Sequence, residues 1–397
     1  MRILTINTGS SSLKAALYER HAERLALVVA ATVERIGLPD AHLRATDPSG
    51  RTLADERRAL PDHPAAAGWV LEWLNSAGFG NAPDAVGHRV VHGGCDLADP
   101  VVVTAGVLER LRALVPLAPS HQPQAIAAIE TCAAAFPGVP QIACFDTAFH
   151  RTLPATARVF ALPRDLEEAG VVRYGFHGLS CESIVAQLRQ EGPLPPRLVI
   201  AHLGNGASMT AVRDGASIET TMGFTPAGGI VMGSRPGDLD PGVIVWLLRE
   251  RGLDADALED VLTRRSGLRG LSGTSGDMRD LLAREADDPR AAQAIAVFCH
   301  RARLTIGSLA AALGGLDALV FTGGIGEHAA PVRERTCAGL DFLGVTLDPR
   351  RNAAGETVVS DDGRPVVVRV MRTDEDREIA RHAARLIRNQ EGADVPL

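Results

Sequence analysis

The chain is almost free of lysine. Of its 41 basic residues, 40 are arginine, and the one lysine stands at position 14. This uniform use of arginine indicates a general bias against lysine, yet one lysine remains beside a Gly-Ser turn. A compact ammonium and a planar guanidinium are not equivalent partners for an anion. We therefore expect Lys14 to be required at its position; the alternative is a lysine kept by chance on a strand surface.

Long apolar runs and long basic runs are also missing. No stretch approaches the roughly 18 apolar residues of a membrane span, and the apolar opening after Arg2 is only a few residues long. The net charge is −7, and the clustered lysine and arginine that sequence-independent nucleic-acid binding needs are not present. The sequence therefore predicts a cytoplasmic protein that binds neither nucleic acid nor membrane.

Cysteine is sparse. Six cysteines are scattered, without a Cys-x-x-Cys pair, over 397 residues, a length that suggests two or three domains with cores of their own. They are interpreted as reduced thiols. No spacing of histidine, cysteine and carboxylate resembles a closed zinc site. Magnesium is different, because one or two carboxylates and the phosphates of a nucleotide hold it without a spacing signature.

Two similar strand-turn-strand units lie half a chain apart. The first spans residues 2–19 and the second 198–215, and an offset of 196 places Ser12 over Ser208 and Ala15 over Ala211. Strands and helices alternate in the segments between and after them, which is typical of α/β proteins. The repeat therefore predicts a duplicated α/β domain with the two copies facing each other.

The remaining elements follow from apolar periodicity and capping residues. Asp240-Pro241 opens a helix, and a capping box at Thr373 opens the last one, which runs to about Asn389 before a frayed tail. We expect the chain to cross between domains near residues 148 and 375, giving a first domain of 1–148 completed by a helix at 376–397, and a second of 149–375. Further strands are expected at 85–92, 141–145 and 317–322, and further helices at 122–136 and 289–313.

Two glycine-rich turns are suited to holding phosphate. They span residues 7–12 and 204–208, and their glycines let backbone N–H groups approach an anion while amide and hydroxyl side chains add donors. Tight hairpin turns favour the same residues, so the duplication and Lys14 are what favour phosphate. A Walker-type loop is excluded because the only lysine follows Leu13.

A third glycine segment is ambiguous. Gly324–Ala329 follows an expected strand and fits the dinucleotide-binding pattern with alanine in its third place. It lies late in the chain, and a strand ending in Gly-Gly-x-Gly equally suits the adenosine of ATP. A dehydrogenase is therefore a distant alternative.

Charged and ring residues gather in short strings. Arg89 and Arg235, flanked by glycine or apolar residues, are either bidentate ligands of a carboxylate or phosphate or members of structural ion pairs. Asp146 ends a buried strand, where we favour a metal or phosphoryl role over an N-cap. His177 lies between glycines in a loop, and His202 precedes the second turn. The strings span residues 88–94, 145–150, 174–178 and 233–241.

Taken together, these strings resemble the acetokinase family of the actin, sugar-kinase and Hsp70 superfamily. The match runs from Asn7-x-Gly-Ser-Ser-Ser-x-Lys14 to Thr373-x-Glu375 and includes 272–279 and 339–344. The resemblance implies two ribonuclease-H-like (actin-like) domains facing across an active-site cleft, with the nucleotide bound by the second, and a homodimer. It also implies reversible Mg²⁺-dependent, direct in-line transfer of a phosphoryl group from ATP to acetate, giving acetyl phosphate and ADP. Mn²⁺ is an alternative metal, and a propionate or other short-chain acyl kinase is the alternative activity.

By the same resemblance, four charged residues would carry the chemistry. Arg89 would bind the carboxylate substrate, Asp146 would be the active-site acid, and His177 with Arg235 would stabilise the transferring phosphoryl. A carboxylate is already ionised at neutral pH, so the reaction needs charge neutralisation and alignment more than it needs a base. We therefore expect Asp146 to orient metal-bound or substrate groups.

The resemblance also implies the binding residues. Asn7 and Glu375 would be the magnesium positions, and Lys14 would approach the nucleotide phosphates. The walls of the pocket for the acetate methyl would be Val91, Phe176 and Pro226. The ATP site would be lined by His202, Leu203, Gly204, Asn205, Gly206, Asp277, Met278, Arg279, Gly324, Ile325, Gly326, Glu327 and His328.

Three residues depart from the family pattern. Cys181 replaces the usual histidine of His-Gly-x-Ser-His, so the supporting hydrogen bond that the resemblance implies there is not expected from this side chain. His328 replaces an asparagine and changes how the nucleotide packs. Ser120 replaces a leucine beside the pocket-side His121 and would make the acyl pocket larger or wetter, so that propionate is an expected substrate.

Overall fold

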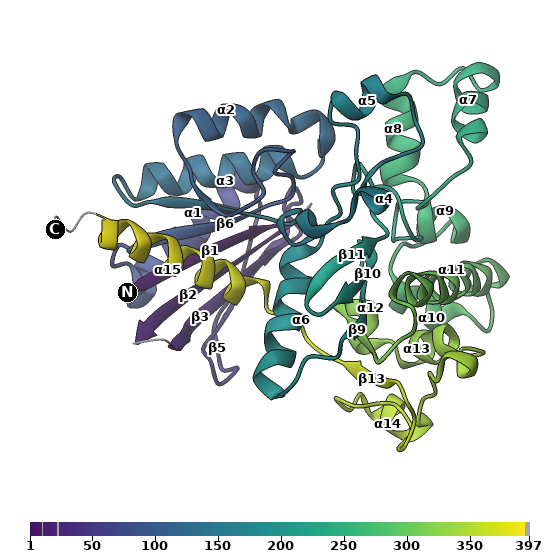
Figure 1. Cartoon of the computed structure of the whole chain (residues 1–397). Helices are drawn as coiled ribbons and strands as arrows, with labels where there is room; N and C mark the ends of the chain where they lie inside the picture. Colours follow the sequence, from purple (N-terminus) through teal and green to yellow (C-terminus); the bar gives the residue numbers. More distant parts are fainter. Residues whose placement is uncertain (10, 22–23, 394–397) are drawn as a thin grey trace. The chain divides into compact units, whose positions relative to one another are not determined.

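The computed structural model describes residues 1–9, 11–21 and 24–393. The chain divides into two compact units (Figure 1). The first contains Met1–Ala148 and Asp374–Leu397, and the second contains Phe149–Thr373. The acidic residues Asp374 and Glu375 therefore belong to the first unit. Within the described residues, none of the helices combines the length and apolar character that a bilayer-spanning segment needs.

An eight-stranded sheet forms the centre of the first unit, in the order β5-β4-β3-β2-β1-β6-β8-β7. Strands β1 to β5 pair antiparallel with one another, β6 runs parallel to β1 and to β8, and β7 is antiparallel to β8. The strands are β1 (Arg2–Thr8), β2 (Ser12–His21), β3 (Arg24–Glu34), β4 (Ala41–Thr46), β5 (Thr52–Arg58), β6 (Ala85–Val90), β7 (Val101–Val102) and β8 (Gln141–Phe145).

Helices cover both faces of this sheet. Six of the seven β1 residues are buried, as expected for a central strand covered on both sides. The helices are α1 (His63–Leu74), α2 (Ala105–Ala113), α3 (Gln122–Ala135) and α15 (Glu375–Ala393), with a π-helical turn at Asn75–Phe79 and a 3₁₀ turn at Val115–Leu117.

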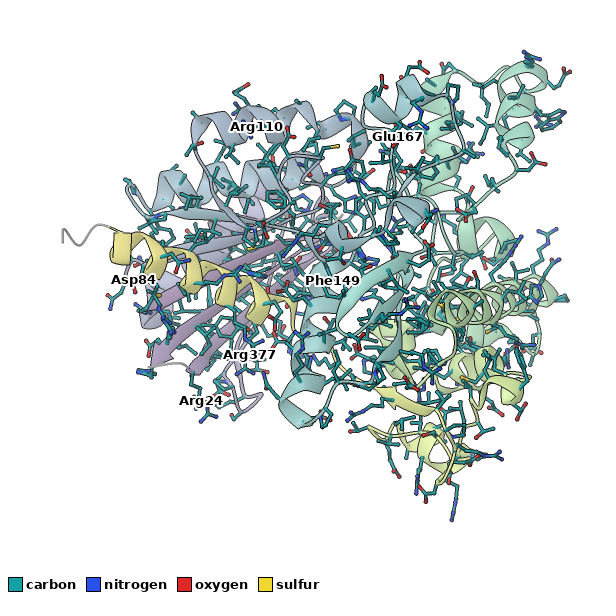
Figure 2. The ribbon with its side chains drawn as sticks, viewed as in Figure 1. Arg24, Asp84, Arg110, Phe149, Glu167 and Arg377 are labelled. Carbon is teal, nitrogen blue, oxygen red and sulfur yellow. The ribbon has the colours of Figure 1, made fainter. Side chains whose placement is uncertain are left out.

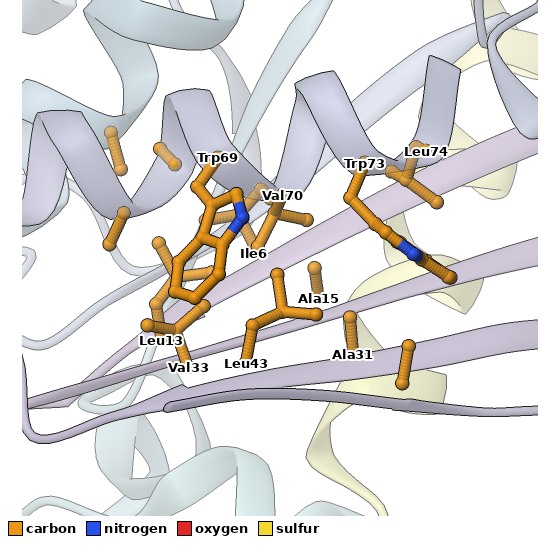
Figure 3. Close-up of a cluster of buried hydrophobic side chains, with 14 of the residues drawn as sticks. Ile6, Leu13, Ala15, Ala31, Val33, Leu43, Trp69, Val70, Trp73 and Leu74 are labelled. Carbon is orange, nitrogen blue, oxygen red and sulfur yellow. The ribbon is translucent and has the colours of Figure 1, made fainter. Parts of the chain in front are cut away.

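Helix α1 supplies the largest side chains of the core on one face. It begins after Asp62, whose carboxylate accepts from the backbone N–H of Ala65 at 2.9 Å. Trp69, Val70 and Trp73 point from α1 onto the aliphatic side chains of the strands (Figure 3). Burial of such a surface is the main stabilising contribution to this unit.

Helix α15 covers the opposite face. A Cβ on Gly87 of β6 would lie 2.5 Å from a methyl carbon of Ile379, so the absence of a side chain there lets the helix approach the sheet closely. Arg377, labelled in Figure 2, donates from Nη2 to the carbonyl of Leu25 on β3 at 3.3 Å. This packing fixes the N-terminus of α15 near the end of β1.

The second unit repeats the central topology of the first. Its five-stranded sheet has the order β11-β10-β9-β12-β13, in which β9, β10 and β11 are antiparallel and β9, β12 and β13 are parallel. Strands β3-β2-β1-β6-β8 follow the same pattern, which confirms the predicted duplication. The strands are β9 (Arg197–Leu203), β10 (Ala207–Arg213), β11 (Ala216–Thr220), β12 (Ala318–Thr322) and β13 (Val367–Val370).

The helices of this unit are numerous and mostly short. Their bounds are α4 (Ala155–Arg158), α5 (Arg164–Glu168), α6 (Gly178–Glu191), α7 (Pro241–Glu250), α8 (Ala255–Arg264), α9 (Gly267–Ser272), α10 (Met278–Arg284), α11 (Pro289–Leu313), α12 (Gly323–His328), α13 (Ala330–Cys337) and α14 (Pro349–Ala354). There are also 3₁₀ turns at Ala148–Thr152 and Asp341–Leu343. The apolar side of α6 packs against β9 and β12 in one buried cluster.

Most predicted elements are confirmed, and the start and end of the last helix are corrected. The Thr373 hydroxyl is buried and has no hydrogen-bond partner in the described part of the chain. Asp374 caps the helix instead, because its carboxylate accepts from the backbone N–H of Arg377 at 3.1 Å. The helix continues to Ala393, so the predicted tail is helical at 390–393, and residues 394–397 lie outside the described residues.

Candidate active site

Asn7 and Glu375 meet where β1 ends. Asn7 is the cross-strand partner of Lys14 in the first hairpin, and its amide Nδ2 donates to Oε2 of Glu375 at 2.9 Å. Glu375 is the first residue of α15. The structure therefore brings together the two residues predicted as magnesium positions, with the exposed Lys14 on the neighbouring strand.

Three consecutive carboxylates, Asp374 to Asp376, open helix α15, where the helix dipole favours negative charge. Burial raises the pKa of Asp376 to about 6; the nearby Lys14 opposes this shift and the neighbouring Glu375 adds to it. The Thr5 hydroxyl lies 3.4 Å from Asp376 and the Tyr18 hydroxyl 3.4 Å from Asp374. The result is a concentration of negative charge suited to a cation.

Arg89 and Asp146 form a tight ion pair at the ends of adjacent parallel strands. Nε and Nη2 of Arg89 donate to the same Asp146 oxygen at 2.9 and 2.5 Å, and Nη1 donates to the Thr8 carbonyl at 3.1 Å. Burial opposes the charge on Arg89, but Asp146, together with Glu375 3.9 Å from Nε, raises the pKa of the guanidinium above its usual value. Arg89 is therefore a fixed cation held by an acid.

The segment after Arg89 is held by two polar side chains that the sequence did not identify. Gln122, buried at the start of α3, accepts from the His92 N–H at 3.3 Å and donates to the His92 carbonyl at 3.1 Å. The Thr147 hydroxyl accepts from the Gly93 N–H at 3.3 Å. These contacts fix the backbone beside Val91, whose side chain is buried.

His177 and His202 stack in the second unit. Their ring centroids are 4.1 Å apart and the planes differ by 18°. Nδ1 of His177 shares a hydrogen bond with the Ser208 hydroxyl at 2.9 Å, and Nδ1 of His202 shares one with Ser180 at 2.8 Å. His177 has a left-handed backbone (φ 56°) as the residue before α6. Both rings are thus oriented by hydroxyls.

Arg235 and His177 converge on Gly206, in the turn of the second hairpin. A Cβ on Gly206 would lie 2.8 Å from Nη2 of Arg235 and 3.3 Å from Nε2 of His177. Nη1 of Arg235 donates to the Pro226 carbonyl, and burial lowers the pKa of Arg235 to about 10. No carboxylate of the described residues forms an ion pair with it. A half-buried cation without a carboxylate partner is suited to bind an anion.

Glycine segments from distant parts of the second unit meet at this turn. The Gly233 N–H donates to the Asn205 carbonyl at 2.9 Å, and a Cβ on Gly233 would lie 3.1 Å from the carbonyl oxygen of Gly276. A Cβ on Gly204 would lie 3.9 Å from the backbone nitrogen of Gly324. The structure thus brings together the predicted turn at 204–206, the start of α12 and the residue before Asp277.

The remaining predicted nucleotide residues differ in exposure. Asp277 caps α10 by accepting from the Arg279 N–H at 2.9 Å and also pairs with the exposed Arg279 guanidinium at 2.6 Å. Met278 is buried. Glu327 accepts from the Gly323 N–H at 3.0 Å and stabilises its own short helix. His328 is exposed.

Comparison with known proteins identifies the family. The model of the Acetokinase family matches residues 2–381. The chain belongs to the acetokinase family. Acetate kinase from Rhodopseudomonas palustris (strain ATCC BAA-98 / CGA009) is 50% identical over 394 residues, which cover 97% of this chain and 98% of that protein. Crystal structures of Porphyromonas gingivalis acetate kinase (35% identical, TM-score 0.85) and of a propionate kinase from Francisella tularensis subsp. tularensis SCHU S4 (34% identical, TM-score 0.88) each cover 97% of this chain and 99% of their own.

Membership of the acetokinase family confirms the predicted resemblance and the duplicated actin-like fold. The three departures from the family pattern lie in different environments. Cys181 is buried in α6, one residue after Ser180, whose hydroxyl contacts His202. Ser120 is half-buried shortly before α3, and the ring of His328 is mostly exposed at the end of α12.

Arg333 is a further acetokinase residue that sequence analysis missed. Its guanidinium is buried, and Nη1 donates to the carbonyls of Gly326 and Glu327, each at 2.9 Å. Nε and Nη2 donate to the side-chain and backbone oxygens of Asn352 at 2.8 and 2.7 Å. Burial lowers the pKa of Arg333. These bonds satisfy the carbonyls at the end of α12, which would otherwise be orphaned.

The donors at Asn7 and Glu375 fit a magnesium ion. Mg²⁺ prefers oxygen ligands and is commonly held by one or two carboxylates together with substrate phosphates. An amide oxygen and a carboxylate supply that set. In the described part of the chain, no three histidine, cysteine, aspartate or glutamate side chains form a metal cluster, so the ion would depend on oxygens of the substrate as well.

Proposed function

We propose that this chain is an ATP:acetate phosphotransferase, a carboxyl-group acceptor kinase. The reaction is reversible transfer of a phosphoryl group from ATP to acetate, which gives acetyl phosphate and ADP. Family membership over residues 2–381 supports this function. The structural observation that carries it is the convergence of the half-buried Arg235 and His177 on Gly206, because such a site stabilises the charge of a transferring phosphoryl group.

The chemistry requires no proton acceptor. An oxygen of the acetate carboxylate attacks the γ-phosphorus, and the bond between that phosphorus and the β–γ bridging oxygen breaks, so that ADP leaves with the electron pair. Arg89 binds the carboxylate, and Arg235 and His177 neutralise the equatorial phosphoryl oxygens. Asp146 holds Arg89 in orientation, which agrees with its two hydrogen bonds to that residue.

The metal and nucleotide roles belong to the same proposal. Asn7 and Glu375 would hold Mg²⁺, or Mn²⁺ in its place, which would neutralise phosphate charge when bound. Lys14 approaches the nucleotide phosphates. The ATP site of the second unit is formed by the turn at 202–206, by 277–279 and by 324–328. Use of ATP as co-substrate also supports a cytoplasmic location.

A propionate or other short-chain acyl kinase is the second candidate function. Ser120 favours it, because a serine in place of the family's leucine leaves more room beside the acyl group. Val91, Phe176 and Pro226 are the proposed pocket walls. One methylene contributes only about 1–3 kcal/mol of discrimination, so the ratio of kcat/KM for the two acids decides between the functions.

We further propose a homodimer in which a second copy covers helix α7. No residue of α7 is buried. Val243, Val245, Trp246 and Leu248 are 41–50% exposed, and apolar groupings of this kind mark protein interfaces. Light scattering after size exclusion should give twice the chain mass, and Trp246→Glu should give the single-chain mass. A monomeric wild-type chain would overturn this assembly.

A coupled assay for ADP tests the proposed activity. ADP release should depend on added acetate and Mg²⁺, and Arg235→Gln should reduce it by about 1,000-fold. Arg350→Gln serves as the matched control, because Arg350 is an exposed arginine of the same unit outside the site. ADP release that is independent of acetate, or equal in both variants, would contradict the proposal.

A further inference from the structure

His150 is the one residue of the 145–150 string whose chemistry the proposed function leaves unused. It lies in the 3₁₀ turn Ala148–Thr152, two residues into the second unit, and its side chain is 2% exposed. The ring of Phe149, labelled in Figure 2, meets the His150 ring edge-on at 5.7 Å. Each ring nitrogen of a buried imidazole is expected to have a hydrogen-bond partner.

Both nitrogens are hydrogen-bonded, and the partners define the tautomer. Nε2 lies 2.9 Å from the Phe176 carbonyl and Nδ1 lies 2.9 Å from the Ser217 hydroxyl. A carbonyl oxygen only accepts, so Nε2 carries the proton, and Ser217 donates to Nδ1. Burial lowers the pKa of His150 to about 4, which keeps the ring neutral. Thr152 donates to the backbone carbonyl of Ser217 at 2.8 Å, and this bond involves neither the Ser217 hydroxyl nor Phe176.

The carbonyl that His150 holds belongs to an unusual turn. Phe176 lies between Gly175, with φ 73°, and His177, with φ 56°, so both neighbours are left-handed. A left-handed backbone is unfavourable for a residue with a side chain and persists only where surrounding contacts fix it. A Cβ on Gly175 would lie 2.6 Å from the His150 ring, so the turn is packed directly against that ring.

We propose that His150 is a positioning residue for phosphoryl transfer. Its Nε2–H holds the Phe176 carbonyl and thereby sets the backbone that aims His177 at Gly206 and places the Phe176 ring. This inference rests on the proposed function, in which His177 acts on the phosphoryl group and Phe176 bounds the acyl pocket. His150 itself touches no reacting atom.

Two isosteric variants test the role. In His150→Gln the amide nitrogen occupies the place of Nε2 and can donate to Phe176, whereas in His150→Asn the amide reaches only Ser217. We expect His150→Gln to keep kcat within about threefold of the wild type, and His150→Asn to lose about 30-fold in kcat with a raised KM for acetate. The KM for ATP should change by less than about twofold in both.

Thr152→Val is the control, because it removes a neighbouring, partly buried hydrogen bond that does not involve Phe176. It should keep near-normal kcat. Equal kcat values for the Asn and Gln variants at equal thermal stability would overturn the proposal. A wild-type chain that makes no acyl phosphate would instead overturn the proposed function, so the two failures are distinguishable.

A measurement on the unaltered protein keeps the inference testable if a variant fails to fold. Nitrogen-15 NMR of the histidine rings should show His150 protonated at Nε2 and not at Nδ1, without titration between about pH 6 and 8. A resonance pattern of the Nδ1–H tautomer, or a ring that titrates in that range, would contradict the hydrogen bond to Phe176.

Discussion

Arg89 donates two hydrogen bonds to one carboxylate oxygen of Asp146, from Nε at 2.9 Å and from Nη2 at 2.5 Å. The Asp146 side chain is 1% exposed and the Arg89 side chain is 13% exposed, so a buried anion is paired with a mostly buried cation. Removing one partner of such an ion pair leaves the other charge buried and unpaired. This lowers the stability of the protein by much more than the intact pair contributes. In this structure the acid holds the guanidinium that we propose binds the carboxylate substrate.

Asp146→Asn should therefore lower turnover because Arg89 loses its anchor. The loss of a proton acceptor is not the reason, since the proposed reaction does not use one. Asparagine can still accept from Arg89, but it removes the charge that holds the guanidinium. We expect kcat to fall by about 100-fold at saturating Mg²⁺, with a raised KM for acetate and little change in the KM for ATP. Initial-rate kinetics with both substrates varied measure this. Near-normal turnover at saturating magnesium would contradict an orienting role as well as a catalytic one.

Arg235→Gln should separate function from stability. The wild-type guanidinium is half-buried, and partial removal from water lowers its pKa to about 10, so the folded protein tolerates a charge that has no acidic partner in the described chain. Removing it should leave the free energy of unfolding unchanged or raise it by about 1 kcal/mol, while kcat falls by about 1,000-fold. Urea denaturation beside kinetics tests both parts. A variant that is both active and destabilised would refute this account.

Gly206→Ala should reduce activity by crowding two groups at once. The added Cβ would lie 2.8 Å from Nη2 of Arg235 and 3.3 Å from Nε2 of His177, so at least one must move. We expect a loss of about 10- to 100-fold in kcat. Gly307→Ala, in α11, is the control, since nothing lies within 4 Å of its Cβ, and it should be slightly stabilising. Equal activity of the two variants would show that the turn tolerates a Cβ at position 206, which would contradict the close approach of Arg235 and His177 to this turn.

Acid should weaken the wild type more than His150→Gln. The pKa of His150 is lowered from 6.5 to about 4 by burial, so the unfolded chain takes up the proton first as the pH falls. The stability due to the neutral ring is complete above pH 6.5 and is lost as the pH falls towards 4. The difference in unfolding free energy, wild type minus variant, should decrease by up to about 3 kcal/mol over that range. Urea unfolding of both proteins at several pH values gives this difference, and a constant value would disprove the assignment.

Ser120→Leu should change the acyl preference. Leucine adds bulk beside the proposed acyl pocket, so the ratio of kcat/KM for propionate over acetate should fall by about 10-fold or more. The KM for ATP should not change. A wild-type ratio far below one, or an unchanged ratio in the variant, would argue against a pocket widened at this position.

The sequence predicted the central strands and long helices well because local chemistry determines them. Gly9 and Gly206 lie between the paired strands of the two hairpins, and the limits of α11 coincide with the apolar pattern of 289–313. The predicted N-cap of α15, Thr373, was wrong because threonine and aspartate are both favourable N-cap residues and Thr373 and Asp374 are adjacent. Tertiary packing decides between them, since Asp374 also meets the Tyr18 hydroxyl.

The assembly of the site could be predicted only in part. The sequence motifs identified Gly206, Arg235 and Gly324 as separate candidate site residues. That the three segments lie close together depends on the paths of loops that are distant in sequence. Arg333 could not be recognised, because one buried arginine looks like any other in a chain with 40 of them. Arg333 can be buried because Asn352, in α14, supplies two acceptors for its guanidinium, and this contact is visible only in the structure.

Trapping the product with hydroxylamine tests the central claim most directly. Purified protein with ATP, Mg²⁺ and acetate should form acetyl hydroxamate in step with ADP, and the yield should fall by about 1,000-fold in Arg235→Gln. Parallel reactions with propionate and butyrate define the acyl range. Stoichiometric hydroxamate is the result that the proposed phosphoryl transfer predicts; ADP without hydroxamate from any of the three acids would contradict it.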